Sequence, residues 1–226
     1  LEETLRQVNR KLSLLSGITR HDIKNQIFAL RAFLKLSRQS AGDPEQVSRL
    51  MEKEEKIIDI IEHQIDITRD YEDIGIQDPV WHAPGKVFSA VAGLHQMSGI
   101  KLEVQTGDAE VFADSHLDRV FFNLIDNTLR HGGKVTRIGL SCTVAEDELV
   151  VVYEDDGQGI PEADKPLIFE RGFGKHTGLG LFLTREILSI SGITINENGE
   201  PGRGARFVIT VPEGDWRMGG PGDRIV

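Results

Sequence analysis

Cysteine is almost missing from this sequence: Cys142 is the only one in 226 residues. A single cysteine cannot form an internal disulfide, and the C-x-x-C spacing of cysteine-rich metal sites is absent. We therefore interpret Cys142 as a small apolar side chain on a strand rather than as a reactive thiol. This cysteine usage suits a reducing, cytoplasmic environment.

Long apolar runs and an excess of positive charge are also missing. No run approaches the roughly 20 residues of a membrane-spanning helix, and no signal-peptide pattern starts the chain. The formal net charge is −10, whereas nucleic-acid binding needs clustered Lys and Arg, so we expect no nucleic-acid partner. Because the chain begins with Leu, we expect a cytoplasmic fragment of a longer protein, which a membrane can still anchor.

Glycine and proline are scarce at the start of the chain, where residues 1–73 hold only Gly17, Gly42 and Pro44. Most glycines come later, and the change falls in residues 74–79, where a glycine and a proline break the helical pattern. We predict four segments: a helical domain over 1–73, a linker over 74–79, an α/β domain over 80–212 and a flexible tail over 213–226.

The first region has the apolar spacing of two long helices. The first helix carries a coiled-coil seam that continues as an apolar stripe: Leu1, Leu5, Val8, Leu12, Leu15, Ile23, Ile27, Leu30 and Leu34. A turn over 39–44 follows, with Asp43 as N-cap and Pro44 at the first helical position. The second stripe is Val47, Leu50, Met51, Ile57, Ile58, Ile61 and Ile65. One hairpin buries too little apolar surface alone, so we predict a homodimeric four-helix bundle.

The second region alternates helical and strand-like patterns. We expect helices over 84–97, 115–130 and 179–190, with Ser115 as an N-cap. We expect strands over 100–105, 110–113, 137–144, 148–154, 193–196 and 205–211, with 145–147 joining a hairpin.

A histidine lies on the polar side of the first helix. His21 and Asn25 are one turn apart and fall nearly opposite the apolar stripe, so both are expected to face solvent. Asp22 can orient one imidazole nitrogen and leave the other nucleophilic, although a plain surface histidine is the alternative. The same face carries Leu14, Ile18 and Phe28, which indicate either a docking surface or a wider bundle core.

Three further segments suit a nucleotide, although each alone is a weak signal. Asn123 and Asn127 share one helix face, and amide oxygens can ligate Mg²⁺. Asp155 begins a D-x-G-x-G run, where a carboxylate can accept a hydrogen bond from an exocyclic amine. The third segment begins a helix, whose free N–H groups suit a phosphate, and reads Thr177-Gly178-Leu179-Gly180.

A short basic loop, residues 160–177 with Lys175, lies between the last two segments and can act as a mobile lid. The alternative for the first segment is a polar helix face, and the alternative for the second is a glycine-rich turn. The sequence has no G-x-x-x-x-G-K-[ST] motif, which excludes a P-loop protein.

In order, these segments resemble the H, N, G1, F and G2 boxes of two-component sensor histidine kinases, over about residues 10–212. The resemblance implies a dimerisation and histidine-phosphotransfer domain over 1–73. It implies a catalytic domain of the Bergerat ATP-binding fold over 80–212, an α/β sandwich shared with gyrase-type ATPases. ATP and Mg²⁺ are the cofactors it implies, and a response regulator receiver domain and an upstream sensor domain are the partners.

The resemblance also implies residue roles. His21 matches the phosphoacceptor, Asp22 the acid beside it, and Asn25 the position linked to dephosphorylation of the regulator. Asn127 matches the Mg²⁺ ligand, and Asp155 the carboxylate that reads adenine. The other positions matched to nucleotide contacts are Asn123, Arg130, His131, Gly157, Gly159, Lys175, Thr177, Gly178, Leu179 and Gly180.

The sequence departs from the family pattern in two places: no proline follows the H-box, and the lid is short. Two rival functions remain at this point. One is an ATPase or a Ser/Thr kinase of the same fold, and the other is a non-enzymatic dimeric scaffold.

Overall fold

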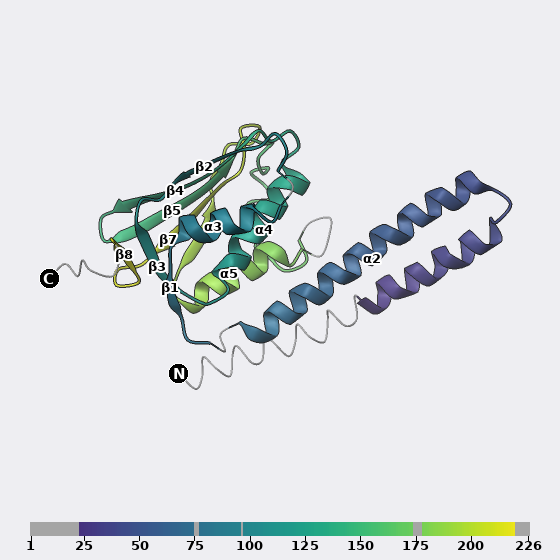
Figure 1. The fold of residues 1–226 in the computed structure, drawn as a ribbon, viewed down its shortest axis with the longest axis horizontal. Coiled ribbons are helices and arrows are strands. Elements are labelled where there is room, and N and C mark those ends of the chain that lie inside the picture. Colours follow the sequence, from purple (N-terminus) through teal and green to yellow (C-terminus); the bar gives the residue numbers. More distant parts are fainter. Residues whose placement is uncertain (1–22, 75–76, 96, 174–177, 220–226) are drawn as a thin grey trace. The chain divides into compact units, whose positions relative to one another are not determined.

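The computed structural model describes residues 23–74, 77–95, 97–173 and 178–219. The chain divides into two compact units, one ending at Asp73 and the next beginning at Ile74. The first is a helical hairpin and the second an α/β domain, which confirms the predicted fold class (Figure 1). None of the helices in these ranges has both the length and the apolar character needed to cross a membrane.

The hairpin consists of two helices joined by a tight turn. Residues 23–39 are helical, and α2 spans Pro44–Asp73. Asp43 caps α2 as predicted, because its Oδ1 accepts a hydrogen bond at 3.1 Å from the backbone N–H three residues further on. Ser37 Oγ donates to Glu54 Oε1 at 2.7 Å, and this partly buried hydrogen bond links the two helices.

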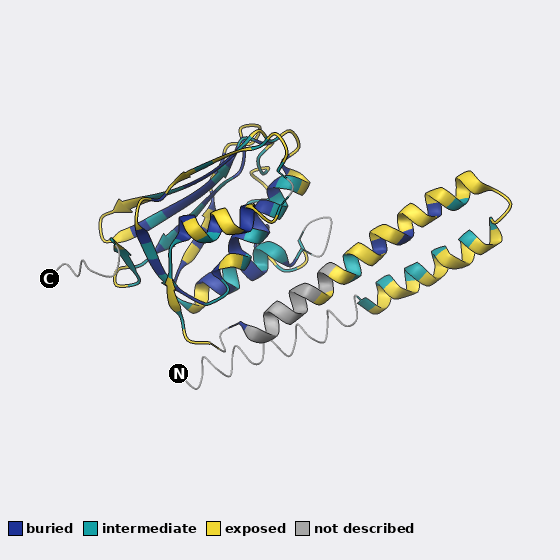
Figure 2. Ribbon diagram, viewed as in Figure 1, coloured by how far each residue is buried: buried dark blue, intermediate teal, exposed yellow. Residues whose placement is uncertain are grey.

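Buried or half-buried positions of the hairpin alternate with exposed ones along both helices (Figure 2), and apolar residues occupy both kinds of position. The face between the two helices holds Leu30, Phe33, Val47, Leu50, Ile57 and Ile61, which are buried or half-buried. The other face is exposed and holds Ile27, Leu34, Met51, Ile58 and Ile65. Members of this second set are seven residues apart within each helix, so the lone hairpin leaves a continuous apolar seam uncovered.

The main sheet of the second unit has five strands in the order β2-β4-β5-β7-β6. The strands are β2 (Lys101–Gln105), β4 (Arg137–Ala145), β5 (Glu148–Asp155), β6 (Thr194–Glu197) and β7 (Arg206–Val211). Only β2 and β4 pair in parallel. Three helices cover one face: α3 (Pro84–Ala92), α4 (Leu117–His131) and α5 (Gly180–Ile190) (Figure 1).

A second, smaller sheet has the order β1-β3-β8 and contains β1 (Val80–His82), β3 (Ala109–Ala113) and β8 (Trp216–Met218). The predicted flexible tail from residue 213 is therefore wrong for β8. Trp216 Nε1 donates to the Asp147 carbonyl at 3.1 Å, and the Arg217 guanidinium lies 4.1 Å from the centre of the Trp81 ring. Contacts so distant in sequence stabilise a strand too short to show a periodic pattern.

The start of α4 corrects the predicted N-cap. The helix begins at Leu117, and Ser115 makes no capping hydrogen bond to it. Instead, the buried Asp114 accepts a hydrogen bond at Oδ1 from the His116 backbone N–H, 2.9 Å away. The same Asp114 Oδ1 lies 2.8 Å from His116 Nδ1. This turn, built on the aspartate side chain, positions the start of the helix.

Two other boundaries differ from the prediction. The helix α3 ends at Ala92 because the chain turns at Gly93, five residues before the expected end. The β4–β5 hairpin has a two-residue loop, Glu146-Asp147, rather than three residues. Glu146 adopts a φ of 54°, as tight two-residue hairpin loops require.

The core of the second unit lies between the main sheet and its helices (Figure 2). Its largest fully buried aromatic side chains are Phe88, Phe121, Tyr153 and Phe207. Cys142 lies on β4 at the edge of this core, and burial raises the pKa of its thiol to about 12. At neutral pH Cys142 is therefore a thiol rather than a thiolate, in line with its interpretation as an apolar side chain.

Candidate nucleotide-binding site

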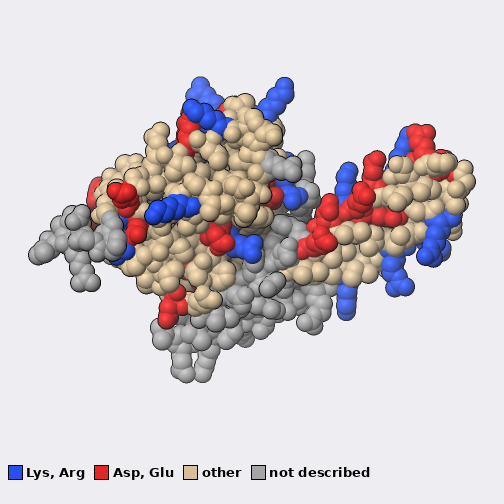
Figure 3. Space-filling model, viewed as in Figure 1, with Lys and Arg blue, Asp and Glu red and all other residues tan. Residues whose placement is uncertain are grey.

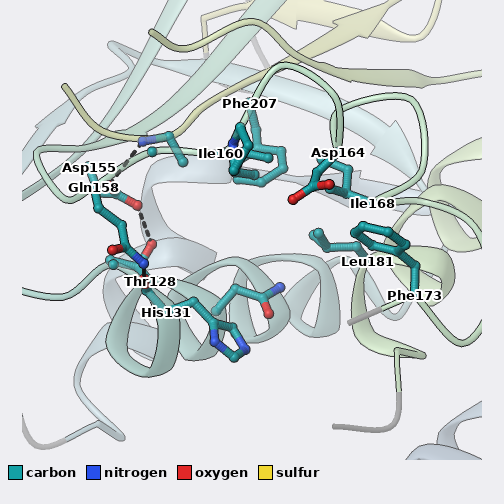
Figure 4. Close-up of a pocket in the computed structure, with 15 residues that line it drawn as sticks. Thr128, His131, Asp155, Gln158, Ile160, Asp164, Ile168, Phe173, Leu181 and Phe207 are labelled. Atoms are coloured by element: carbon teal, nitrogen blue, oxygen red, sulfur yellow. Dashed lines mark hydrogen bonds between the residues drawn. The ribbon is translucent and has the colours of Figure 1, made fainter. Parts of the chain in front are cut away.

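A cavity of about 380 Å³ opens beside the C-terminal half of α4 (Figure 4). Its walls come from α4, the loop after β5, the turn over residues 158–168, the start of α5, and β7. The lining residues are Asn127, Thr128, His131, Gly132, Asp155, Gln158, Gly159, Ile160, Pro161, Asp164, Ile168, Phe173, Leu181, Ala205 and Phe207. Four predicted nucleotide residues therefore share one cavity: Asn127, His131, Asp155 and Gly159.

Asp155 is the most tightly held side chain of the cavity wall, and only 4% of its surface is exposed. Its Oδ1 accepts hydrogen bonds from the backbone N–H groups of Gly157, at 2.9 Å, and Ala205, at 3.1 Å. Its Oδ2 accepts one from Thr128 Oγ1 at 2.6 Å. These donors come from three separate segments and fix the carboxylate plane. A carboxylate has about four acceptor positions, so one lone pair is left for a ligand donor.

Tyr153 acts on the Asp155 carboxylate through Thr128. Its hydroxyl lies 2.8 Å from Thr128 Oγ1 and 3.2 Å from the Leu124 carbonyl, which it can reach as a donor. Burial raises the pKa of the Tyr153 phenol well above its usual range, so the group stays protonated. The hydroxyl of Thr128 thus keeps its own proton for Asp155. This buried network has all its members satisfied and holds Asp155 in one orientation.

The loop after β5 is fastened to the end of α4. Gln158 donates through its backbone N–H to the Gly132 carbonyl at 2.9 Å, and through Nε2 to the His131 carbonyl at 2.5 Å. These bonds satisfy carbonyls at the helix C-terminus, which have no partner within the helix. A Cβ on Gly157 would lie 2.5 Å from the Gly132 carbonyl oxygen. The glycine is thus required for close backbone packing rather than for contact with the cavity.

The two asparagines of α4 have different surroundings. Asn127 lines the cavity. Asn123 is buried and does not line it; its Nδ2 donates to the Gly180 carbonyl at 3.0 Å and reaches Thr184 Oγ1 at 3.3 Å. The spacing of the two asparagines on α4 is as predicted. The side chain of Asn123, however, forms hydrogen bonds that join α4 to α5. Gly180 packs against the same asparagine, since an added Cβ would lie 3.4 Å from its Oδ1.

Several other predicted ligand residues lie away from the described cavity wall. Arg130 is exposed and pairs with Asp126 at 2.7 Å, one helical turn earlier. Gly178 has a φ of 59°, and a Cβ there would lie 2.5 Å from Gly172, so it closes the base of the short loop. Leu179 is buried at the start of α5. Lys175 and Thr177 lie outside the described residues.

The predicted phosphoacceptor region of the first unit is described only in part. His21 and Asp22, together with Leu14 and Ile18, lie outside the described residues. Asn25 is exposed, as the helical geometry predicts. Phe28 is 77% exposed, the most exposed large apolar residue of the described part of the hairpin. This exposure does not fit a role in widening the core of a single hairpin.

Sequence reasoning missed most of the apolar wall and three polar residues of the cavity. Thr128 follows the predicted Asn127, and Gln158 lies between the predicted Gly157 and Gly159. Their positions within the N and G1 segments could therefore have indicated that they line the site. Asp164 and Ile168 are four residues apart, which hinted at a shared face in the loop after the D-x-G-x-G run. Ala205 and Phe207 gave no local signal, because only sheet pairing brings β7 to the site.

The comparisons with known proteins agree with this geometry. The model of the family described as histidine kinase-, DNA gyrase B-, and HSP90-like ATPase matches residues 113–215, which contain every lining residue named above. The chain is 37% identical over 102 residues to the alginate biosynthesis sensor protein KinB of Pseudomonas aeruginosa. It is 23% identical over 230 residues to the sensor histidine kinase YcbM of Bacillus subtilis, covering 92% of this chain and 73% of YcbM.

Over both of its units the chain is similar to sensor histidine kinases. The KinB match covers 42% of this chain but only 17% of KinB, so the chain spans a small part of that relative. The second unit of this chain contains the match to the ATP-binding ATPase family.

Solved structures show the same fold in both units of this chain. The histidine kinase ThkA, solved in complex with the response regulator protein TrrA, is 20% identical with a TM-score of 0.66. That match covers 94% of this chain and 66% of ThkA. The Acinetobacter baumannii histidine kinase AdeS has a TM-score of 0.61 at 20% identity, covering 86% of this chain and 98% of AdeS.

Proposed function

We propose that this kinase core transfers the γ-phosphoryl group of ATP to its own His21 and then to an aspartate of a response regulator receiver domain. The buried Asp155 is the observation that carries this proposal. Asp155 lines a cavity within the region that matches the ATPase family and keeps one acceptor position, for which an adenine amine is a donor of suitable chemistry. The asparagines, aspartate and glycines of the motif set distinguish the chain from a scaffold that has lost nucleotide binding.

The proposed reaction is an in-line displacement. The adenine amine donates to Asp155, and the phosphates extend toward the start of α5. An imidazole nitrogen of His21 forms the new N–P bond while the bond to the ADP oxygen breaks, and the imidazole proton passes to Asp22. Positioning and charge stabilisation supply most of the catalysis in such transfers.

Asn127 is the residue we propose to hold Mg²⁺ with the nucleotide. Its amide oxygen is a hard donor on the cavity wall, which fits this ion. The described residues contain no group of three or more His, Cys, Asp or Glu side chains that could hold a metal alone. The ion would thus be shared between protein and phosphates, where it neutralises charge on the phosphoryl oxygens.

Incubation of the purified chain with γ-labelled ATP and Mg²⁺ tests the proposal. Phosphohistidine is labile in acid and stable in alkali, whereas phosphoserine and phosphothreonine show the opposite behaviour. Label with the first pattern supports a histidine kinase. Acid-stable label would favour a Ser/Thr kinase of the same fold instead.

For Asn25 we propose a role in removing phosphate from the regulator. Asn25 is exposed and follows His21 by four residues in the sequence, so its amide can reach a docked partner and position a water. ThkA was solved with a response regulator, which supports a regulator as the partner here. Asn25→Ala is expected to slow regulator dephosphorylation by about tenfold or more, while autophosphorylation stays within about twofold.

Phosphate release from a purified phosphorylated regulator, compared with wild type, measures this effect. Lys24→Ala, at the neighbouring exposed position, is the matched control and should leave the release rate near that of wild type. An Asn25→Ala protein that dephosphorylates the regulator at the wild-type rate would remove Asn25 from the proposal.

We also propose that the hairpin pairs with a second copy through its exposed apolar seam. The seam residues Ile27, Leu34, Met51, Ile58 and Ile65 have heptad spacing, and a four-helix bundle would bury all five. Such a bundle is also the element through which an upstream sensor domain could act. A charge at the centre of this seam would be buried without a partner in the dimer.

Ile58→Glu is therefore expected to weaken dimerisation by at least about a hundredfold, since an unpaired buried charge costs about 3 kcal/mol or more. Sedimentation equilibrium over a range of protein concentrations measures the dissociation constant. Lys56→Glu introduces the same side chain at an exposed position on another face of α2 and should leave dimerisation unchanged within a few-fold. Equal dimerisation by the Ile58→Glu protein would place the interface elsewhere.

A further inference from the structure

We propose that Asp164 is a second anchor for the Mg²⁺ that accompanies the nucleotide, binding the ion's water molecules through its carboxylate. The inference rests on the proposed function, and it names the ligand as the Mg²⁺ complex of a nucleoside triphosphate. Asp164 lines the cavity across from Asp155, beside Ile168 and above Leu181 (Figure 4). With adenine on Asp155, Asp164 stands at the phosphate end, next to the start of α5.

The backbone holds Asp164 in a fixed turn. Its N–H donates to the Pro161 carbonyl at 2.9 Å, and its own carbonyl accepts from Leu167 at 2.8 Å and Ile168 at 3.0 Å. The next residue, Lys165, anchors this turn to the loop after β6, because its Nζ donates to the Gly199 carbonyl at 2.6 Å. The Asp164 side chain is thus directed at the cavity by a rigid support, as a ligand-binding group requires.

The Asp164 carboxylate has no hydrogen bond or ion pair with any described residue. The adjacent cation does not neutralise it, because Lys165 is engaged by Gly199, by Glu162 at 2.7 Å and by Glu197 at 3.6 Å. An acceptor with free lone pairs, half-exposed at a cavity wall, is suited to donors that a ligand brings.

The charge of the cavity wall indicates that the ligand of Asp164 is a hydrated cation rather than a bare phosphate. The described lining contains two carboxylates, Asp155 and Asp164, and neither Lys nor Arg. A bare triphosphate placed beside Asp164 would be repelled. Mg²⁺ reverses this relation because it keeps several bound waters, whose hydrogens are strong donors to a carboxylate. Asn127 alone offers the ion a neutral oxygen, so Asp164 would supply the negative charge.

Isothermal titration of a non-hydrolysable ATP analogue, AMP-PNP, tests this role without any catalytic step. Affinity is measured in excess Mg²⁺ and in EDTA at matched ionic strength, for wild type, Asp164→Asn and Asp164→Glu. Asp108→Asn is the matched control, since it makes the same chemical change at an exposed turn outside the cavity. Adenosine, which carries no phosphate, reports on the base pocket alone.

Asp164→Asn should weaken binding with Mg²⁺ and strengthen binding in EDTA, so that the enhancement by Mg²⁺ falls by about tenfold or more. Asp164→Glu should keep most of the enhancement, and Asp108→Asn should keep all of it. Adenosine affinity should not change in any variant.

Wild-type enhancement in Asp164→Asn would overturn the inference while leaving ATP binding in place. An equal loss of AMP-PNP affinity in Mg²⁺ and in EDTA would also overturn it, and so would a parallel loss of adenosine affinity. Either result would indicate that Asp164 shapes the pocket rather than binding the ion. Failure of the wild type to bind AMP-PNP at all would instead overturn the proposed function, and this inference with it.

Discussion

Replacing His21 with glutamine is expected to remove the acid-labile label from the kinase core. Glutamine keeps a polar side chain of similar reach but has no nucleophilic nitrogen, so no N–P bond can form. Loss of a nucleophile typically lowers a rate by at least about a thousandfold, which here means label at the background level. The measurement is incorporation from γ-labelled ATP with Mg²⁺, followed by parallel acid and alkali treatment.

The control for this experiment is nucleotide affinity. His21 belongs to the helical unit, whereas the cavity lies within the second unit, so His21→Gln should bind AMP-PNP as wild type does. Acid-labile label that survives in the variant would mean that another histidine is the acceptor. No label on either protein, with nucleotide bound, would contradict autophosphorylation by this kinase core.

Asp155→Asn is expected to lower ATP affinity by about a hundredfold. The wild-type carboxylate accepts from Thr128, Gly157 and Ala205 and has one position left for the adenine amine. An asparagine amide keeps only one acceptor atom. Its NH₂ group therefore faces either the adenine amine and the Thr128 hydroxyl, or the backbone N–H groups of Gly157 and Ala205. A buried donor without an acceptor costs about 1–3 kcal/mol, and the lost bond to the ligand adds to this.

The same substitution should also change base selectivity. Guanine has a carbonyl oxygen where adenine has its amine, so wild type should strongly prefer ATP over GTP. The new NH₂ group of Asp155→Asn can donate to that oxygen, and the preference should shrink by at least about tenfold. Titration calorimetry with both nucleotides measures the two affinities, and thermal melting checks that the variant is folded.

Asp156→Asn is the matched control for this prediction. Asp156 is the next residue, but its carboxylate accepts from the Thr136 backbone N–H at 2.8 Å and the Arg137 backbone N–H at 2.9 Å and does not line the cavity. Its ATP affinity should stay within about twofold of wild type. Wild-type ATP affinity in the Asp155→Asn protein would show that adenine binds elsewhere.

Local patterns predicted most of the elements but not their ends. The heptad spacing and the Asp43-Pro44 start predicted the hairpin, because a helix repeats on a scale of a few residues. The flexible tail was wrong because Trp216 and Arg217 are stabilised by residues far away in the chain. The Ser115 cap was wrong because the buried Asp114 competes for the same helix start.

The candidate site shows the same division. Asp155 and Gly159 were predictable because the D-x-G-x-G run stands in order among the other motif segments, whereas the run alone would also suit a glycine-rich turn. Asn123 was placed on the correct helix face, but only the packing of α5 decided that its amide joins two helices instead of facing the cavity. Thr128 and Phe207 reach the site through sheet and helix packing, which no local pattern reports.

The sequence by itself determined the helical hairpin, the α/β domain and the motif residues of the nucleotide site, because these depend on short-range periodicity and on residue chemistry. The tertiary structure alone decided which motif residues meet in one cavity, which apolar side chains of the hairpin stay uncovered, and where Asp164 points. Those outcomes depend on contacts between segments far apart in the chain, and their geometry is set only when the helices and strands pack.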